Sequence, residues 1–142
     1  MDNDILEVGI WIQYAQEDYD CAVEIAKTNN PYAARKASYD CQQSAEKILK
    51  AYVIAQKGTR YKEHNLLILL KQCSQYSSDF NNLNMACSVL SMYITATRYP
   101  SNVKLTKSDM EQALKYASQI LEFTKSKLKE LKYEYVPEQA EE

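Results

Sequence analysis

The side chains best suited to chemistry in this sequence include a cation and a phenol that stand side by side. Arg98 and Tyr99 lie directly before Pro100, and proline disfavours α-helical backbone at the residue that precedes it. We therefore expect the pair where a helix ends. A guanidinium offers a planar fork of donors that matches phosphate, and a tyrosine ring offers a stacking face with a hydroxyl. Arg98 and Tyr99 thus indicate contacts with a phosphate and a base.

Four more polar residues extend this candidate site. Gln43, Lys47 and Lys50 recur at i, i+4 and i+7, so they share a face of one predicted helix, where the two lysines add positive charge. His64 is the single histidine and stands near the start of the next predicted helix. We predict that these four residues, with Arg98 and Tyr99, bind a phosphate or nucleotide.

Each of these residues also has a purely structural interpretation. His64 suits a hydrogen-bonding or capping position, and Lys47 and Lys50 suit a solvated helix face. Arg98 suits the last carbonyls of its helix or an internal carboxylate, and Tyr99 suits a packed aromatic position. For Arg98 and Tyr99 in particular, both interpretations stay open.

Several kinds of active site are excluded because the sequence lacks their motifs. The sequence has no nucleophile motif and no His-and-carboxylate metal spacing, and its two glycines are too few for a phosphate-binding loop. The carboxylates are expected on exposed helix faces. We therefore predict no catalytic residue, no metal and no cofactor. The four cysteines lack a Cys-x-x-Cys pair and are expected as reduced, mostly buried thiols: Cys21, Cys41, Cys73 and Cys87.

Composition indicates an all-α protein. Apolar residues make up 46% of the 142 residues and charged residues 25%, while two Gly and three Pro leave few interruptions of regular structure. A net charge of −2 gives no broad attraction to nucleic acid but leaves room for a local basic patch. No apolar run of about 20 residues and no signal peptide is found, so we expect a cytoplasmic protein without membrane contact.

Apolar periodicity predicts a single-domain up-and-down bundle of about five helices, four long and one short. Asn30 is expected to cap the second helix with Pro31 in its first turn, and Thr106 with Asp109 to form a capping box on the last. The short third helix is expected to be buried around most of its circumference. The bundle should cover 1–131, and 132–142 should be an acidic, frayed tail. The predicted helices are about 6–27, 31–56, 63–73, 80–97 and 106–131.

Four segments in this order resemble the HEPN domain family over about residues 6–128. They are WIQYAQEDYDCAVEIA (11–26), YDCQQSAEKILKAYVIAQKG (39–58), EHNLLILL (63–70) and TRYP (97–100). The resemblance implies a five-helix bundle that often forms homodimers and that works with nucleotides or RNA. It also implies a prokaryotic context in which many members act with a small nucleotidyltransferase, some of them as toxin and antitoxin.

Several members of that family are metal-independent ribonucleases that use an Arg followed, after four to six residues, by a His. Counted from Arg98, those positions hold Val103, Lys104 and Leu105. We therefore favour a non-catalytic nucleotide- or RNA-binding module that acts with a nucleotidyltransferase. One alternative is a metal-independent ribonuclease toxin with an atypical site, in which His64 is the base and Arg98 stabilises the developing charge. The other is a helical protein–protein interaction module whose twelve tyrosines supply contacts.

Overall fold

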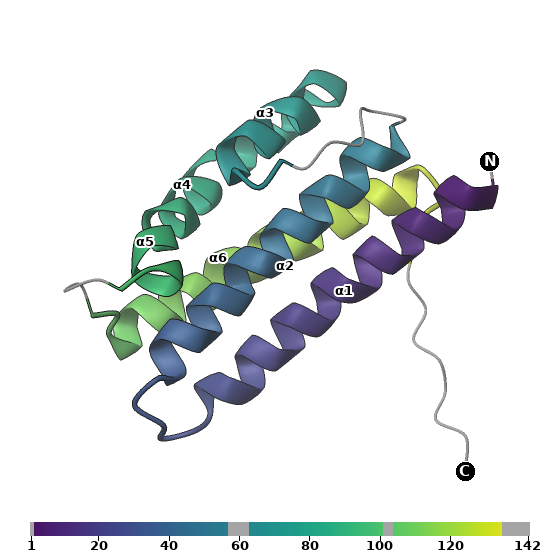
Figure 1. The fold of residues 1–142 in the computed structure, drawn as a ribbon. Helices are drawn as coiled ribbons and strands as arrows, with labels where there is room; N and C mark the ends of the chain where they lie inside the picture. The colour runs from purple at the N-terminus through teal and green to yellow at the C-terminus, as the bar shows by residue number, and fades with distance from the viewer. Residues whose placement is uncertain (1, 57–62, 101–103, 135–142) are drawn as a thin grey trace, which may run out of the picture.

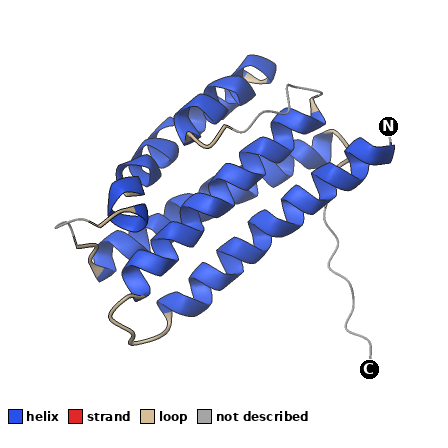
Figure 2. Cartoon of the chain, viewed as in Figure 1, coloured by secondary structure: helices blue, strands red, loops and turns tan. Residues whose placement is uncertain are grey.

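Three long helices form the frame of the protein in a computed structural model that describes residues 2–56, 63–100 and 104–134 (Figure 1). A row of shorter helices lies along one side of this frame. Figure 2 shows helices and loops but no strand in these described ranges, which confirms the predicted all-α bundle. The long helices are α1 (Asp2–Ala26), α2 (Ala33–Ala55) and α6 (Lys107–Glu130). The row consists of α3 (Leu66–Tyr76), the 3₁₀-helix η1 (Ser78–Leu83), α4 (Asn84–Met92) and α5 (Ile94–Arg98).

The central element is α2, which contacts α1, α6, α3, α4 and α5. Fourteen of its 23 residues are buried, so it is covered around most of its circumference. Small side chains let α1 and α2 approach closely, and the Ser44 hydroxyl donates a hydrogen bond of 2.8 Å to the Ala15 carbonyl across their interface. The backbone of α2 is therefore held in place by its neighbours.

Aromatic rings join the row of shorter helices to the frame. The Phe80 ring lies 4.5 Å from that of Tyr52 and 5.2 Å from that of Phe123, measured between centroids. The prediction that the third helix is buried around most of its circumference is wrong. Leu67 and Ile68 are exposed, because α3 packs on the frame from one side only.

The predicted long helix over about 80–97 is broken into η1, α4 and α5. Ser, Asp and Asn dominate η1, and these residues compete with α-helical hydrogen bonding through their side chains. A second break falls at Tyr93, whose backbone N–H bonds the carbonyls of Leu90 and Ser91. The short α5 then places Arg98 at its last position, as the TRYP sequence predicts.

The helix starts match the predictions in part. The capping box of Thr106 and Asp109 is confirmed at the start of α6. The side-chain cap predicted for Asn30 is wrong, because Pro31 and Tyr32 form a turn in which the Asn30 backbone carbonyl bonds Ala33 N–H instead. Tyr32 stands at the N-cap of α2 without a side-chain bond.

The third helix begins at Leu66 rather than near Glu63. The Asn65 side chain caps it by accepting hydrogen bonds from the N–H groups of Leu67 and Ile68. Glu63 instead accepts bonds from the backbone N–H groups of His64 and Asn65, which orders the segment that carries the histidine.

The cysteines follow the predicted burial at three of four positions. Burial raises the pKa of the Cys41 thiol, with a smaller contribution from Asp40, and that of the Cys87 thiol, each to about 12. Cys73 is also buried, whereas Cys21 is exposed on α1. Among the described residues, no helix is long and apolar enough to cross a membrane. Of the expected C-terminal tail, 135–142 lies outside those residues.

Candidate functional site

A buried carboxylate on α2 gathers three of the predicted site residues. The side chain of Glu46 is only 6% exposed, which corrects the expectation that the carboxylates lie on exposed faces. Its Oε1 lies 3.2 Å from Nδ1 of His64 and 4.0 Å from Nη2 of Arg98, and its Oε2 lies 3.7 Å from Nζ of Lys50. A buried carboxylate is costly unless cations or donors surround it. Glu46 therefore fixes the positions of these three side chains.

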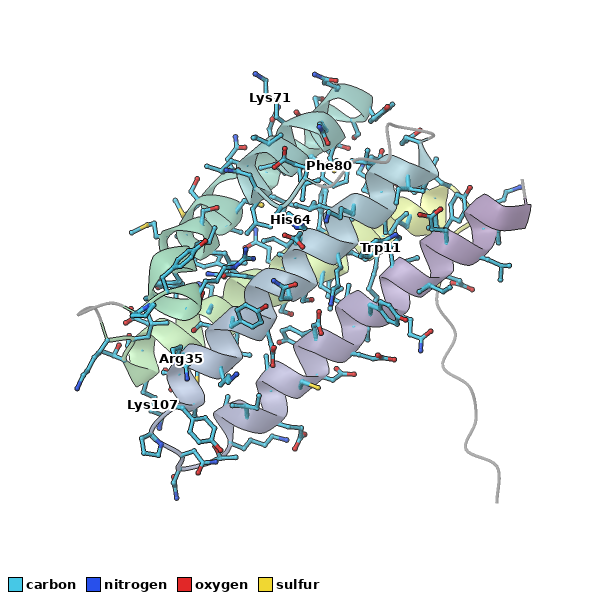
Figure 3. The ribbon with its side chains drawn as sticks, viewed as in Figure 1. Trp11, Arg35, His64, Lys71, Phe80 and Lys107 are labelled. Atoms are coloured by element: carbon cyan, nitrogen blue, oxygen red, sulfur yellow. The ribbon has the colours of Figure 1, made fainter. Side chains whose placement is uncertain are left out.

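Nδ1 of the His64 ring has two polar neighbours on α2, Glu46 and Lys50. Nδ1 of the ring lies 3.2 Å from Oε1 of Glu46 and 3.5 Å from Nζ of Lys50, so it donates to the carboxylate when it carries a proton and accepts from the lysine when it does not. In the tautomer that carries the proton on Nδ1, Nε2 is the acceptor. The His64 side chain is 61% exposed and lies alongside the middle of α2 (Figure 3), so its ring is accessible to a ligand.

Arg98 is positioned by the docking of α5 on α2. The hydroxyl of Thr97 lies 3.1 Å from Oε1 of the buried Gln42, whose Nε2 donates a 2.9 Å bond to the Leu90 carbonyl. The Arg98 guanidinium then lies over the Tyr39 ring, 5.8 Å from its centroid. Its Nε is buried without a hydrogen-bond partner among the described residues. The guanidinium is thus held in place while part of its donor capacity stays unused.

Two hollows meet at Arg98, one of about 680 Å³ and one of about 430 Å³. They share four lining residues: Arg35, Thr97, Arg98 and Tyr99. The larger hollow continues to Tyr32 and Lys104, and the smaller to Lys36 and Tyr39. Four of the described lining residues are cations, and none is a carboxylate. Both volumes lie in the range of small-molecule sites, and their lining suits an anionic ligand with aromatic parts.

The start of α2 adds to the positive field in the larger hollow. Its first turn contains no acidic residue and its N-cap, Tyr32, has no side-chain bond, so the positive end of the helix dipole is not neutralised. Figure 3 shows Arg35 at this end of α2. Among the described residues, neither Arg35 nor Lys36 makes an ion pair. A local basic patch therefore exists on a chain whose net charge is −2.

The six predicted site residues do not all come together. Arg98, Lys50 and His64 meet at Glu46, and Tyr99 lines both hollows with 64% of its surface exposed. Lys47 turns toward α1, where its Nζ lies 2.6 Å from Oδ2 of Asp18.

Gln43 is the predicted site residue that remains, and Lys50 has a further neighbour besides Glu46. Gln43 is half-buried and lines neither hollow. Lys50 places its Nζ 5.6 Å from the centroid of the Trp11 ring, so an aromatic face borders the cluster.

Sequence reasoning missed Glu46, Tyr39, Arg35, Lys36 and Lys104. A signal for part of this set was present, because positions 36, 39, 43, 46 and 50 fall on one face of a helix. No such signal joins Lys104 to that face, since it lies after α5 in the sequence. Among the described residues, no group of three or more His, Cys, Asp or Glu side chains is arranged to hold a metal ion.

The fold and this cluster define an all-α bundle protein with a cationic site on its central helix. The model of the HEPN domain family matches residues 8–128, and the chain belongs to that family. The crystal structure of an archaeal HEPN homologue has a similar fold, with a TM-score of 0.66 at 22% identity. That match covers 86% of this chain and 98% of the homologue. A search of curated proteins finds no match.

Proposed function

We propose that this HEPN protein is a non-catalytic module that binds a nucleotide or RNA at the hollows beside Arg98. The observation that supports this proposal best is the lining of those hollows by cations and tyrosines, without a carboxylate among the described residues. An anionic phosphate enters such a site at little cost, and the tyrosine faces suit the bases attached to it.

Arg98 is the residue assigned to the phosphate. Glu46 and the Tyr39 ring hold its guanidinium, so little side-chain entropy is lost when a ligand binds. Tyr99 stands beside it at the surface and can stack on a base. Lys50 contacts the other carboxylate oxygen of Glu46 and adds positive charge there, and His64 shares Oε1 of Glu46 with Arg98.

The non-catalytic part of the proposal follows from the sequence after Arg98. The positions at which ribonucleases of the family carry His are Val103, Lys104 and Leu105 here. Loss of a general acid or base costs about 10²–10⁴ in rate. As in many members of the family, we propose that the module acts as a homodimer with a small nucleotidyltransferase, in a system of the toxin–antitoxin kind.

One observation favours a second candidate function, a metal-independent ribonuclease. His64 and Arg98 both contact Oε1 of Glu46, so a base and a phosphate-binding cation stand at one point. In that reaction Nε2 of His64 takes the proton of a ribose 2′-hydroxyl, and the oxygen attacks the adjacent phosphorus. The 5′-oxygen leaves with a proton from solvent, a 2′,3′-cyclic phosphate forms, and Arg98 stabilises the charge of the phosphorane.

Calorimetry with ATP and with a short single-stranded RNA, together with a cleavage gel in EDTA, tests both candidates. We expect the wild type to bind without cleavage and Arg98→Ala to lose affinity. Lys71→Ala, on the exposed face of α3, is the control and should bind like the wild type. Absence of binding would contradict the proposal and point to a protein partner. Cleavage in EDTA that His64→Ala abolishes would establish the ribonuclease instead.

A further inference from the structure

The outer face of α1 carries large apolar side chains that the rest of the described chain leaves exposed. Figure 1 shows this helix at the edge of the bundle, and it packs on α2 and α6. The exposed fraction is 57% for Ile5, 66% for Leu6, and 46% for both Ile10 and Tyr14. These four residues lie within about three turns of helix. Exposed apolar side chains gathered in one place are typical of a surface that contacts another molecule.

Gly9 lies among these side chains, and nothing within the protomer explains it. The residue stands inside α1 with an ordinary helical backbone, so no turn or positive φ requires a glycine. Apart from its own stretch of helix, no described atom lies within 4 Å of the place where a Cβ would stand. Glycine in a helix interior costs about 0.5–1 kcal/mol relative to alanine, and it permits the close approach of another backbone. Gly9 therefore marks the apolar face as a contact point for a second helix.

The charge pattern of this face suits a second copy of the chain. Two-fold symmetry places the same surface on both sides of an interface, so a charged residue beside the axis would meet its own counterpart. Positions 5, 6, 9, 10, 13 and 14 hold no charged residue, although charged residues make up 25% of the chain. Toward the end of α1, the first exposed charge on this side is Glu17, about two turns beyond Gly9. Two helices that cross at Gly9 have diverged at that distance.

The area of the face fits a weak dimer. At these exposed fractions, the four apolar side chains present roughly 450 Å² in each copy. Two copies with their flanking residues then bury about 1,000 Å², which is near the lower limit for a specific interface. The expected Kd for such a dimer is about 1–100 μM.

We propose that α1 is the interface of a homodimer in which two copies of the helix cross at Gly9 and Ile10. This inference rests on the proposed function for the homodimer and adds where the two copies meet. Because α5 docks on α2 and α4, whereas α1 packs on α2 and α6, the hollows beside Arg98 lie outside this interface. Each protomer therefore keeps its own Arg98 site accessible to a ligand.

Sedimentation velocity over a range of protein concentrations tests this interface. The wild type should pass from monomer to dimer as its concentration rises. Ile10→Lys brings two ammonium groups together beside the axis and should raise the Kd by at least about tenfold. Ile68→Lys is the matched control, because Ile68 on α3 is 45% exposed against 46% for Ile10. It should dimerise like the wild type.

Gly9→Leu distinguishes a specific crossing from unspecific apolar association. The substitution adds a side chain where the protomer has open space and improves helix propensity, so it should raise the temperature of unfolding of the monomer. It also adds apolar surface, yet it should raise the Kd of the dimer about tenfold or more because it forces the two backbones apart. Tighter dimerisation of Gly9→Leu would overturn the crossing at Gly9.

Cross-linking locates the contact directly. In a Cys21→Ser background, Ile10→Cys should form an intermolecular disulfide, because residues beside a two-fold axis lie within the Cα separation of about 4.4–6.8 Å that a disulfide needs. Ile68→Cys in the same background is the control and should not cross-link. Equal cross-linking at both positions would overturn α1 as the interface.

Binding of ATP and RNA, measured on the same proteins, separates this inference from the proposed ligand site. Ile10→Lys should bind both ligands like the wild type, since Arg98 lies outside the interface. A wild type that stays monomeric at every concentration would overturn the α1 interface and the homodimer, while ligand binding that depends on Arg98 would stand. A dimer that Ile10→Lys leaves intact would keep the homodimer and overturn α1 as its interface. If the protein dimerises through α1 but Arg98→Ala changes neither ATP nor RNA binding, only the proposed ligand site fails.

Discussion

Nη2 of Arg98 lies 4.0 Å from Oε1 of Glu46, at the point where α5 ends against the middle of α2. The carboxylate is buried and the guanidinium is partly exposed, so the pair faces the protein on one side and a hollow on the other. Coulomb attraction across this distance holds the arginine without using all of its donors. Glu46 therefore acts as an internal support for a cation that lines both hollows.

Glu46→Gln removes this support and should destabilise the protein. The amide cannot balance the positive charges of Lys50 and Arg98, which then face an uncharged, largely buried group. Removal of one partner from a buried ion pair costs about 3–5 kcal/mol, and partial exposure of Arg98 places the expected loss near 2–3 kcal/mol. Urea denaturation followed by circular dichroism measures the free energy of unfolding.

The control for this change is Glu24→Gln, at an exposed residue that pairs with Lys27 on the surface of α1. It should change the free energy of unfolding by less than about 0.5 kcal/mol. If both substitutions changed the free energy of unfolding equally and only slightly, Glu46 would not stabilise the fold by balancing the charges of Lys50 and Arg98.

Two buried threonines give a second prediction, because only one of them has a hydrogen-bonding role. The hydroxyl proton of Thr97 reaches Oε1 of the buried Gln42 and also the Ile94 carbonyl. Thr124 is fully buried, and its hydroxyl has no partner among the described residues. Thr97→Val leaves Oε1 of Gln42 without this donor and should cost about 1–3 kcal/mol, whereas Thr124→Val should be neutral or stabilising.

Thermal unfolding of both valine variants checks this difference. Thr97→Val should also weaken RNA binding, since it loosens the contact of α5 with α2 that positions Arg98. A Thr124→Val protein that loses as much stability as Thr97→Val would contradict the assignment of the Gln42 hydrogen bond.

Features formed by residues close together in the sequence could be predicted, whereas those that join distant residues could not. The capping box of Thr106 and Asp109 could be predicted because both partners lie within one turn. The burial of Glu46 could not, since its partner Arg98 comes from α5 and its partner His64 from the segment before α3. The break at Tyr93 was missed because the apolar spacing continues through it.

Among the residues of the candidate site, too, those marked by their neighbours in the sequence could be predicted and those placed by tertiary contacts could not. Arg98 and Tyr99 were found because Pro100 marks a helix end within the sequence itself. Arg35 has no distinguishing neighbour in the sequence, and only the docking of α5 beside the start of α2 brings it to the same hollows.

Thiol reactivity gives a third prediction. Cys21 is exposed, whereas Cys41, Cys73 and Cys87 are buried with raised pKa values. One thiol of the native protein should therefore react with Ellman's reagent, and all four should react after denaturation. Cys21→Ser should abolish the native reaction. Slight burial and then the charge of Asp40 raise the pKa of Cys21 as well, so its reaction should quicken as pH rises above neutrality. Rapid reaction of more than one thiol in the native protein would contradict the burial of Cys41, Cys73 and Cys87.

Asp40 gives the last prediction, which concerns stability and pH. Burial raises the pKa of its carboxyl above the ordinary value of 3.8, and the charge of Asp18 raises it further, while Lys36 and Lys47 lower it. The folded state thus holds the Asp40 proton more tightly than the unfolded state does. Ionisation at neutral pH therefore costs stability, and this cost disappears below the ordinary pKa. Asp40→Asn should unfold at a higher temperature than the wild type at neutral pH.

The advantage of Asp40→Asn should shrink as pH falls toward 3.8, because the wild-type carboxyl then becomes neutral too. Thermal unfolding of both proteins at a series of pH values measures this change. Glu111→Gln, at an exposed residue of α6, is the matched control and should show little difference at any pH. A gain at neutral pH that persists undiminished in acid would mean that the amide stabilises by a new contact rather than by loss of charge. Lower stability of Asp40→Asn at neutral pH would show that Lys36 and Lys47 outweigh burial and Asp18 at this carboxyl.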